Sequence, residues 1–111
     1  MEIQPTAPWY HGTNQMIDVL YTGSTITQWR ELAEAFSHKP SMLEIGDDGR
    51  ICHNGEAYGY LYQIDESICV GIEVYPHPRT TMDLNMEFLT AKPLKVKLIQ
   101  EIDIVKDKTF I

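Results

Sequence analysis

A single stretch of this chain has the apolar spacing of a helix, and the segments on both sides of it have the residue types of strands. Four apolar residues in this stretch follow the i, i+3, i+4, i+7 spacing of one helix face: Trp29, Leu32, Ala33 and Phe36. We expect a helix over residues 26–36, with Thr25 and Gln28 as a capping box at its start. Pro40 requires the helix to end before it.

Strands are expected where β-branched and aromatic residues gather between turn residues. The expected strands cover residues 9–11, 19–22, 41–45, 50–53, 58–64, 69–74, 86–90 and 95–104. Two prolines predict a loop over residues 75–79. Because one helix cannot supply the crossovers that parallel strands need, we expect an α+β, β-rich fold. Its expected form is two packed antiparallel or mixed sheets with one main helix.

Length and charge narrow the function classes. A chain of 111 residues indicates one domain, which we expect to span residues 1–111. The net charge of −7 disfavours nucleic acid and anionic membrane surfaces as partners. We find no apolar run of membrane-spanning length and no secretory signal, so we expect no membrane partner and a cytoplasmic location. We therefore expect Cys52 and Cys69 to be reduced core thiols, and the cysteines and histidines lack the spacing of metal ligands.

A histidine followed by glycine marks the first candidate site element, His11-Gly12-Thr13. The imidazole is a polar group at a strand end, and the glycine lets a flat ligand approach the backbone amide. The alternative is a hydrogen-bonded structural histidine beside a turn glycine.

Two further candidates are Tyr21 and Glu87. Tyr21 precedes the expected helix and offers a flat ring for stacking, although a core aromatic is the alternative. Ser24, close to it, is either a capping residue or part of a pocket lining. Glu87 interrupts an apolar strand start, so it is either a carboxylate aimed into a cleft or an outward-facing strand residue.

Taken in chain order, these motifs resemble the ADP-ribosyltransferase superfamily, in particular the branch with a His-Tyr-Glu triad that includes the poly(ADP-ribose) polymerase catalytic domains. The small rifampicin ADP-ribosyltransferases are also similar. The segments that carry the resemblance are Tyr10-His11-Gly12-Thr13, Tyr21 to Thr25, Gly59-Tyr60-Leu61-Tyr62 and Thr90-Ala91-Lys92-Pro93-Leu94. The resemblance covers about residues 9 to 104 and implies an ADP-ribosyltransferase-like fold.

The resemblance also implies a substrate and residue roles. NAD would be the substrate, with His11 bonded to a ribose hydroxyl and Gly12 holding the nicotinamide carboxamide. Tyr21 would stack on the nicotinamide, and Thr13 and Ser24 would belong to the same pocket. Glu87 would support the oxocarbenium-like transition state as nicotinamide leaves.

The expected reaction is therefore mono-ADP-ribosylation of an acceptor that the sequence does not identify, for instance a protein. Rifampicin is disfavoured as the acceptor, because the rifampicin enzymes lack a glutamate at the position of Glu87. Two alternatives stay open. One is an RNA 2′-phosphotransferase-like enzyme, against which the small number of arginines counts. The other is a catalytically silent module that binds a nucleotide or a protein.

Overall fold

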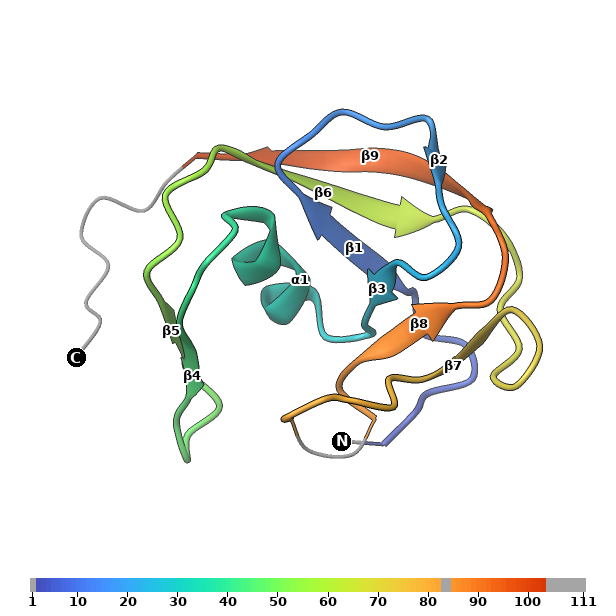
Figure 1. Cartoon of the computed structure of the whole chain (residues 1–111), viewed down its shortest axis with the longest axis horizontal. Coiled ribbons are helices and arrows are strands. Elements are labelled where there is room, and N and C mark those ends of the chain that lie inside the picture. Colours follow the sequence, from blue (N-terminus) through green and yellow to red (C-terminus); the bar gives the residue numbers. More distant parts are fainter. Residues whose placement is uncertain (1, 83–84, 104–111) are drawn as a thin grey trace.

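Three antiparallel sheets and one short helix form the part of the chain that the computed structural model describes, residues 2–82 and 85–103 (Figure 1). The largest sheet has four strands in the order β1-β6-β9-β2. Its strands are β1 (Tyr10–Thr13), β6 (Gly59–Ile64), β9 (Leu94–Ile102) and β2 (Val19–Leu20). A register shift between Leu61 and Tyr62 interrupts the pairing of β6 with β9.

A three-stranded sheet and a separate hairpin complete the strands. The three-stranded sheet has the order β3-β8-β7. The remaining strands are β3 (Thr25–Ile26), β8 (Phe88–Thr90), β7 (Val74–Pro76) and the hairpin strands β4 (Leu43–Ile45) and β5 (Ile51–His53). A turn at Gly46 to Gly49 closes the hairpin, with Gly49 at a φ of 82°. Glycine fits this position because other residues rarely adopt a positive φ.

The main hydrophobic core combines side chains from the four-stranded and three-stranded sheets. Its buried members are Trp9, Leu20, Ile26, Ile64, Val74, Phe88 and Leu94. Trp9 and Phe88 meet edge to face, with ring centroids 4.9 Å apart and an interplanar angle of 83°. Aromatic pairs favour this geometry because the positive edge of one ring faces the negative face of the other. This contact joins the start of β1 to β8.

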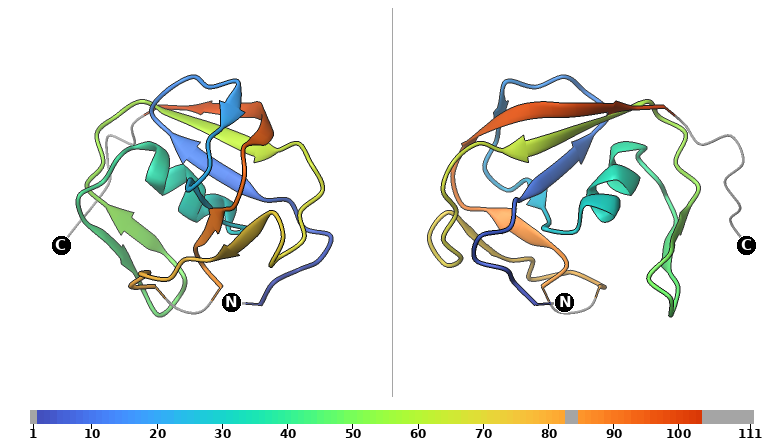
Figure 2. Two further views of the ribbon diagram at one scale, coloured as in Figure 1. Left: turned by 45° about the vertical axis from the view of Figure 1, so that its right-hand side comes forward. Right: turned by 180° about the vertical axis from the view of Figure 1, so that it is seen from behind.

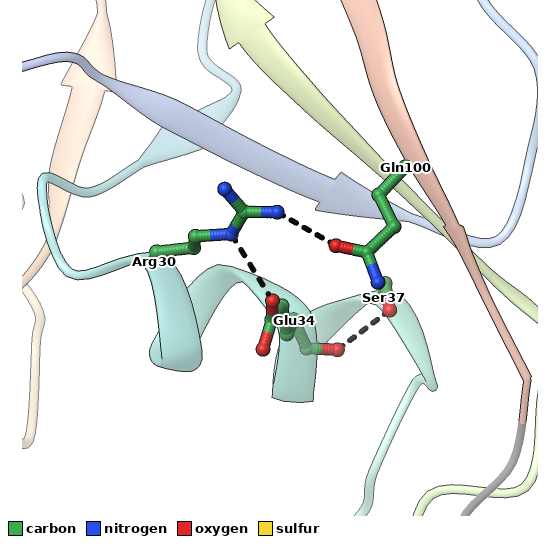
Figure 3. A network of polar contacts seen from close by, with 4 residues as sticks. All are labelled: Arg30, Glu34, Ser37 and Gln100. Carbon is green, nitrogen blue, oxygen red and sulfur yellow. Dashed lines mark hydrogen bonds and ion pairs between the residues drawn. The ribbon is translucent and has the colours of Figure 1, made fainter.

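Helix α1 (Arg30–Ser37) packs against β1 and β6, and the buried residues Leu32 and Ala33 belong to its inner face. Gly12 allows a very close approach, since a Cβ at this position would lie 1.7 Å from the carbonyl oxygen of Ala33. Arg30 ties the exposed side of the helix to β9, because its guanidinium donates to Glu34 at 3.2 Å and to Gln100 at 2.6 Å (Figure 3).

The β4–β5 hairpin lies on the far side of α1 from the three-stranded sheet, as both views of Figure 2 show. It is fastened near its base by stacking of His53 on His38, with ring centroids 5.4 Å apart and planes 11° from parallel. The Asn54 side chain accepts the backbone N–H groups of Ser41 and Met42. The hairpin is therefore held to the end of α1, while its tip extends away from the core.

The expected α+β, β-rich class with one helix is confirmed, and every strand pair described is antiparallel. The expected capping box is wrong. Thr25 belongs to β3, and α1 begins only after Trp29, which provides no side-chain cap. The Gln28 side chain instead bonds the backbone of Gln4. Pairing of Thr25 in a sheet has thus overridden the local helix signal.

Other boundaries also differ from expectation. Of the strand expected over residues 69–74, only Val74 belongs to a strand; Val70 makes an isolated bridge, and residues 71–73 form a turn. The expected loop over residues 75–79 contains Tyr75 and Pro76 of β7. β7 is an edge strand, where proline is tolerated. Cys69 is exposed and not a core thiol, while Cys52 is partly buried; both are free. Residue 104 of the last expected strand lies outside the described residues. No helix within the described ranges has the length and apolarity needed to cross a membrane.

Candidate functional site

The candidate site lies where β1 of the four-stranded sheet runs beside β3 of the three-stranded sheet. Tyr10 and Thr27 exchange backbone hydrogen bonds of 2.7 and 3.0 Å and so join β1 to the residue after β3. One residue further along β1, the contact to the other strand is made by a side chain instead. Nδ1 of His11 lies 2.7 Å from the backbone oxygen of Thr25. The imidazole therefore links β1 to β3.

The bond to Thr25 fixes the tautomer of His11. A carbonyl oxygen only accepts hydrogen bonds, so Nδ1 carries the proton and donates it. Burial lowers the pKa of His11 below its usual value; the bond to Thr25 opposes this effect, and the charge of Lys39 adds to it. The ring is therefore held neutral with a lone pair on Nε2. In this state His11 can accept a hydrogen bond from a ligand hydroxyl.

Gly12 directs its backbone groups to the same edge of β1 as Tyr10. Trp9 accepts a hydrogen bond from Ile64 of β6, while Tyr10 bonds to Thr27 on the opposite edge of β1. Successive residues of a strand direct their amide groups to alternate edges. The N–H and C=O of Gly12 consequently face the same edge as those of Tyr10, on the side of β3. The absent side chain of Gly12 is on the helix side, where it makes room for the backbone of α1.

Glu87 immediately precedes β8 and is partly buried. Thr25 pairs with Leu89 and Ile26 with Phe88, so the same register continued by one residue sets Glu87 opposite Thr27. The hydroxyl of Thr80 donates to the Glu87 carboxylate, and the Glu87 carbonyl accepts the N–H of His77. Glu87 is thus held beside the point where the two sheets meet, two residues or about 7 Å along β8 from the partner of Thr25.

Tyr21 is positioned differently from His11 and Glu87. Its side chain is 73% exposed. Its carbonyl oxygen accepts the hydroxyls of Ser24 at 2.6 Å and Thr90 at 3.0 Å. Thr90 is the last residue of β8, whereas Glu87 precedes the first. The segment of residues 25–27 therefore lies between His11 on β1 and Glu87 before β8, and the structure gives no direct contact between these two side chains. The Tyr21 backbone lies at the other end of β8, and its ring is exposed.

Thr13 and Ser24 have local roles in the structure. The buried Thr13 hydroxyl accepts the N–H of Gln15 at 3.2 Å. Ser24 exchanges hydrogen bonds with Thr90 and donates to Tyr21. These contacts shape the turns that follow β1 and β2, and neither one excludes a further contact with a ligand.

Sequence reasoning missed a pocket on the helix side of the meeting point. It has a volume of about 510 Å³ and includes Tyr10, Trp29, Arg30 and Met86 in its lining. The guanidinium carbon of Arg30 lies 5.9 Å from the centroid of the Tyr10 ring. The apolar helix spacing predicts that Trp29 belongs to the core, but Trp29 is only partly buried. No local signal distinguishes such a residue, because its exposure depends on where the second sheet packs.

Comparison with known proteins gives no match to any family model, to any curated protein or to any solved structure.

Proposed function

We propose that this chain is an NAD-dependent mono-ADP-ribosyltransferase with an ADP-ribosyltransferase-like fold. The observation that carries the proposal is the bond from His11 on β1 to Thr25 on β3, beside the edge of β1 to which the N–H and C=O of Gly12 are directed. A neutral imidazole with a free acceptor nitrogen suits a ribose hydroxyl. A residue whose backbone N–H and C=O face the same edge suits a carboxamide, which has the complementary acceptor and donor.

In the proposed reaction, the bond between C1′ of the ribose and the nicotinamide nitrogen breaks, and nicotinamide leaves with the bonding electron pair. Positive charge then develops on C1′ and the ring oxygen of the ribose. The Glu87 carboxylate stabilises this charge, and the bond from Thr80 orients it. An acceptor nucleophile forms the new bond to C1′ and loses its proton. Water in place of the acceptor would give free ADP-ribose.

The resemblance assigns the stacking role to Tyr21, and we retain this assignment in the proposal. Tyr21 lies on a turn and its ring is exposed, so the ring can change rotamer without disturbing the core. Thr13 and Ser24 complete the proposed lining of the nicotinamide pocket.

The arrangement of the arginines favours this reaction over the RNA 2′-phosphotransferase alternative. Arg30 begins α1 and is engaged with Glu34 and Gln100, Arg50 precedes β5, and Arg79 lies in the turn after β7. They occupy three separate elements, so they do not form the group of several arginines that the resemblance leads us to expect of a phosphotransferase.

The test is release of nicotinamide from NAD by the full chain, with and without a cell lysate as the source of acceptor. We expect Glu87→Gln to lower the rate by a factor of about 100 or more, the usual effect of losing a charge-stabilising group. Glu56→Gln, an exposed change of the same type, should keep the wild-type rate. Failure of the wild type to release nicotinamide in either condition would reject the proposal. Binding of NAD without turnover would instead support the silent module.

A further inference from the structure

A second hollow adjoins the pocket beside Tyr10. It has a volume of about 610 Å³ and lies between the β4–β5 hairpin, the start of α1 and the segment that leads to β8. The two hollows share Trp29 and Met86 in their linings, so they lie next to each other, and we treat them together as one surface groove. We call this the hairpin groove, and its part nearer the hairpin is lined by Trp29, Leu43, Glu44, Ile45, Gly46, Asp47, Gly49, Thr81, Met82 and Met86.

The charged groups of this part of the groove are all acidic. Glu44 and Asp47 are both exposed, and no lysine or arginine is among its lining residues. Within residues 2–82 and 85–103, the only ion pair joins Arg30 to Glu34, so neither Glu44 nor Asp47 is neutralised by a salt bridge. Arg30 lines the other part of the groove, and its guanidinium is already engaged. The groove therefore favours a cationic occupant.

The apolar lining suits a polypeptide better than a small cation. Trp29 lines both hollows, and the face of an indole ring attracts a lysine or arginine side chain through a cation–π interaction. Met82 and Met86 are flexible and polarisable, and such side chains adapt to varied apolar partners. Leu43 and Ile45 add aliphatic surface on the hairpin side.

The groove is physically connected to Glu87. Met86 is its sequence neighbour, and the Thr80 hydroxyl accepts the N–H of Met82 at 3.1 Å while donating to the Glu87 carboxylate. A segment lying in the groove would thus pass beside the group to which we assign stabilisation of the transition state.

We propose that the hairpin groove binds a basic segment of an acceptor polypeptide, with a lysine or arginine side chain over Trp29 and between Glu44 and Asp47. This inference rests on the proposed function, because it places the acceptor next to Glu87. It adds the chemical class of acceptor, a cationic peptide segment that also carries apolar side chains.

The test measures peptide binding in the absence of NAD. The probe is a fluorescein-labelled ten-residue peptide of alternating arginine and leucine, followed by fluorescence polarisation; its counterpart carries glutamate in place of arginine. We expect the basic peptide to bind and the acidic one not to bind. The double variant Glu44→Lys/Asp47→Lys should weaken binding at least tenfold. The matched control, Glu56→Lys/Asp65→Lys, makes the same change in net charge at exposed positions outside the groove and should retain binding.

Equal weakening by the two double variants would overturn the inference, because it would show attraction to the overall charge alone. Binding of the acidic peptide, or of a single-stranded oligonucleotide in preference to the basic peptide, would also overturn it. So would a wild-type dimer in sedimentation that the Glu44→Lys/Asp47→Lys change dissociates, since a second copy would then occupy the groove. Peptide binding without any nicotinamide release would reject the proposed function and leave the groove assignment standing.

Discussion

The backbone of Gly12 lies so close to the carbonyl of Ala33 that β1 and α1 leave no space for a side chain between them. A methyl group on Gly12 would lie 1.7 Å from that carbonyl oxygen and 2.9 Å from the backbone nitrogen of Ser37. Both obstacles are backbone atoms, so no change of rotamer relieves the contact. The glycine that faces the proposed nicotinamide pocket with its amide also sets the distance between the helix and the sheet.

We therefore predict that Gly12→Ala lowers the free energy of unfolding by about 3 kcal/mol or more, at the upper end of overpacking effects. The control is Gly23→Ala. Gly23 has a φ of 84° and open space around it, so this change adds only the conformational penalty, about 1 kcal/mol. Urea denaturation followed by circular dichroism measures both. Equal losses for the two variants would contradict the close approach of β1 and α1.

His11 predicts a pH dependence of stability. Its pKa is lowered in the folded state by burial, so the unfolded chain takes up a proton at this residue before the folded chain does. The contribution of His11 is fully present above a pH of about 6.5, the usual pKa of histidine, and is lost as the pH falls through the folded-state value.

The measurement is the free energy of unfolding at pH 7.5, 6.5 and 5.5 for the wild type and for His11→Asn, whose amide can still donate to Thr25. The wild type should lose more stability than the variant as the pH falls. Parallel pH profiles would show that the imidazole is not held neutral.

Thr27 and Thr25 predict a contrast between two similar substitutions. The Thr27 side chain is buried and its hydroxyl accepts the N–H of Trp29 at 3.0 Å, just before α1 begins. Thr27→Val removes this acceptor, and we expect a loss of about 1–3 kcal/mol. Thr25 bonds His11 through its backbone oxygen, so Thr25→Val should cost less than about 0.5 kcal/mol. If the capping box existed, the order of the two losses would be reversed.

Tyr21 allows the proposed stacking role to be separated from stability. Since its ring is 73% exposed, we expect Tyr21→Ala to change the free energy of unfolding by less than about 0.5 kcal/mol. If the ring stacks on nicotinamide, the same variant should raise the KM for NAD at least tenfold. Unchanged NAD kinetics would remove Tyr21 from the site, without consequence for His11 and Glu87.

The sequence alone was sufficient for the fold class and for the strands whose residue types are unambiguous. The aromatic and aliphatic residues of β6 predict a strand in any context, because they suit a half-buried pleated surface. The sequence also predicts the helix, because the spacing of Leu32, Ala33 and Phe36 matches the pitch of a helix. The sequence also indicates His11, Gly12 and Glu87 as residues able to bind or react, because this ability depends on their residue types.

Tertiary structure decided the rest, because each remaining feature depends on contacts between residues far apart in the chain. Thr25 joins β3 and not the helix because β8, more than sixty residues later, offers it a pairing partner. The packing of the two sheets against each other decides whether His11 reaches the carbonyl of Thr25, whether the Tyr21 ring faces solvent and whether Trp29 lines a groove. This packing is made by side chains from distant parts of the chain, and local sequence patterns do not encode it.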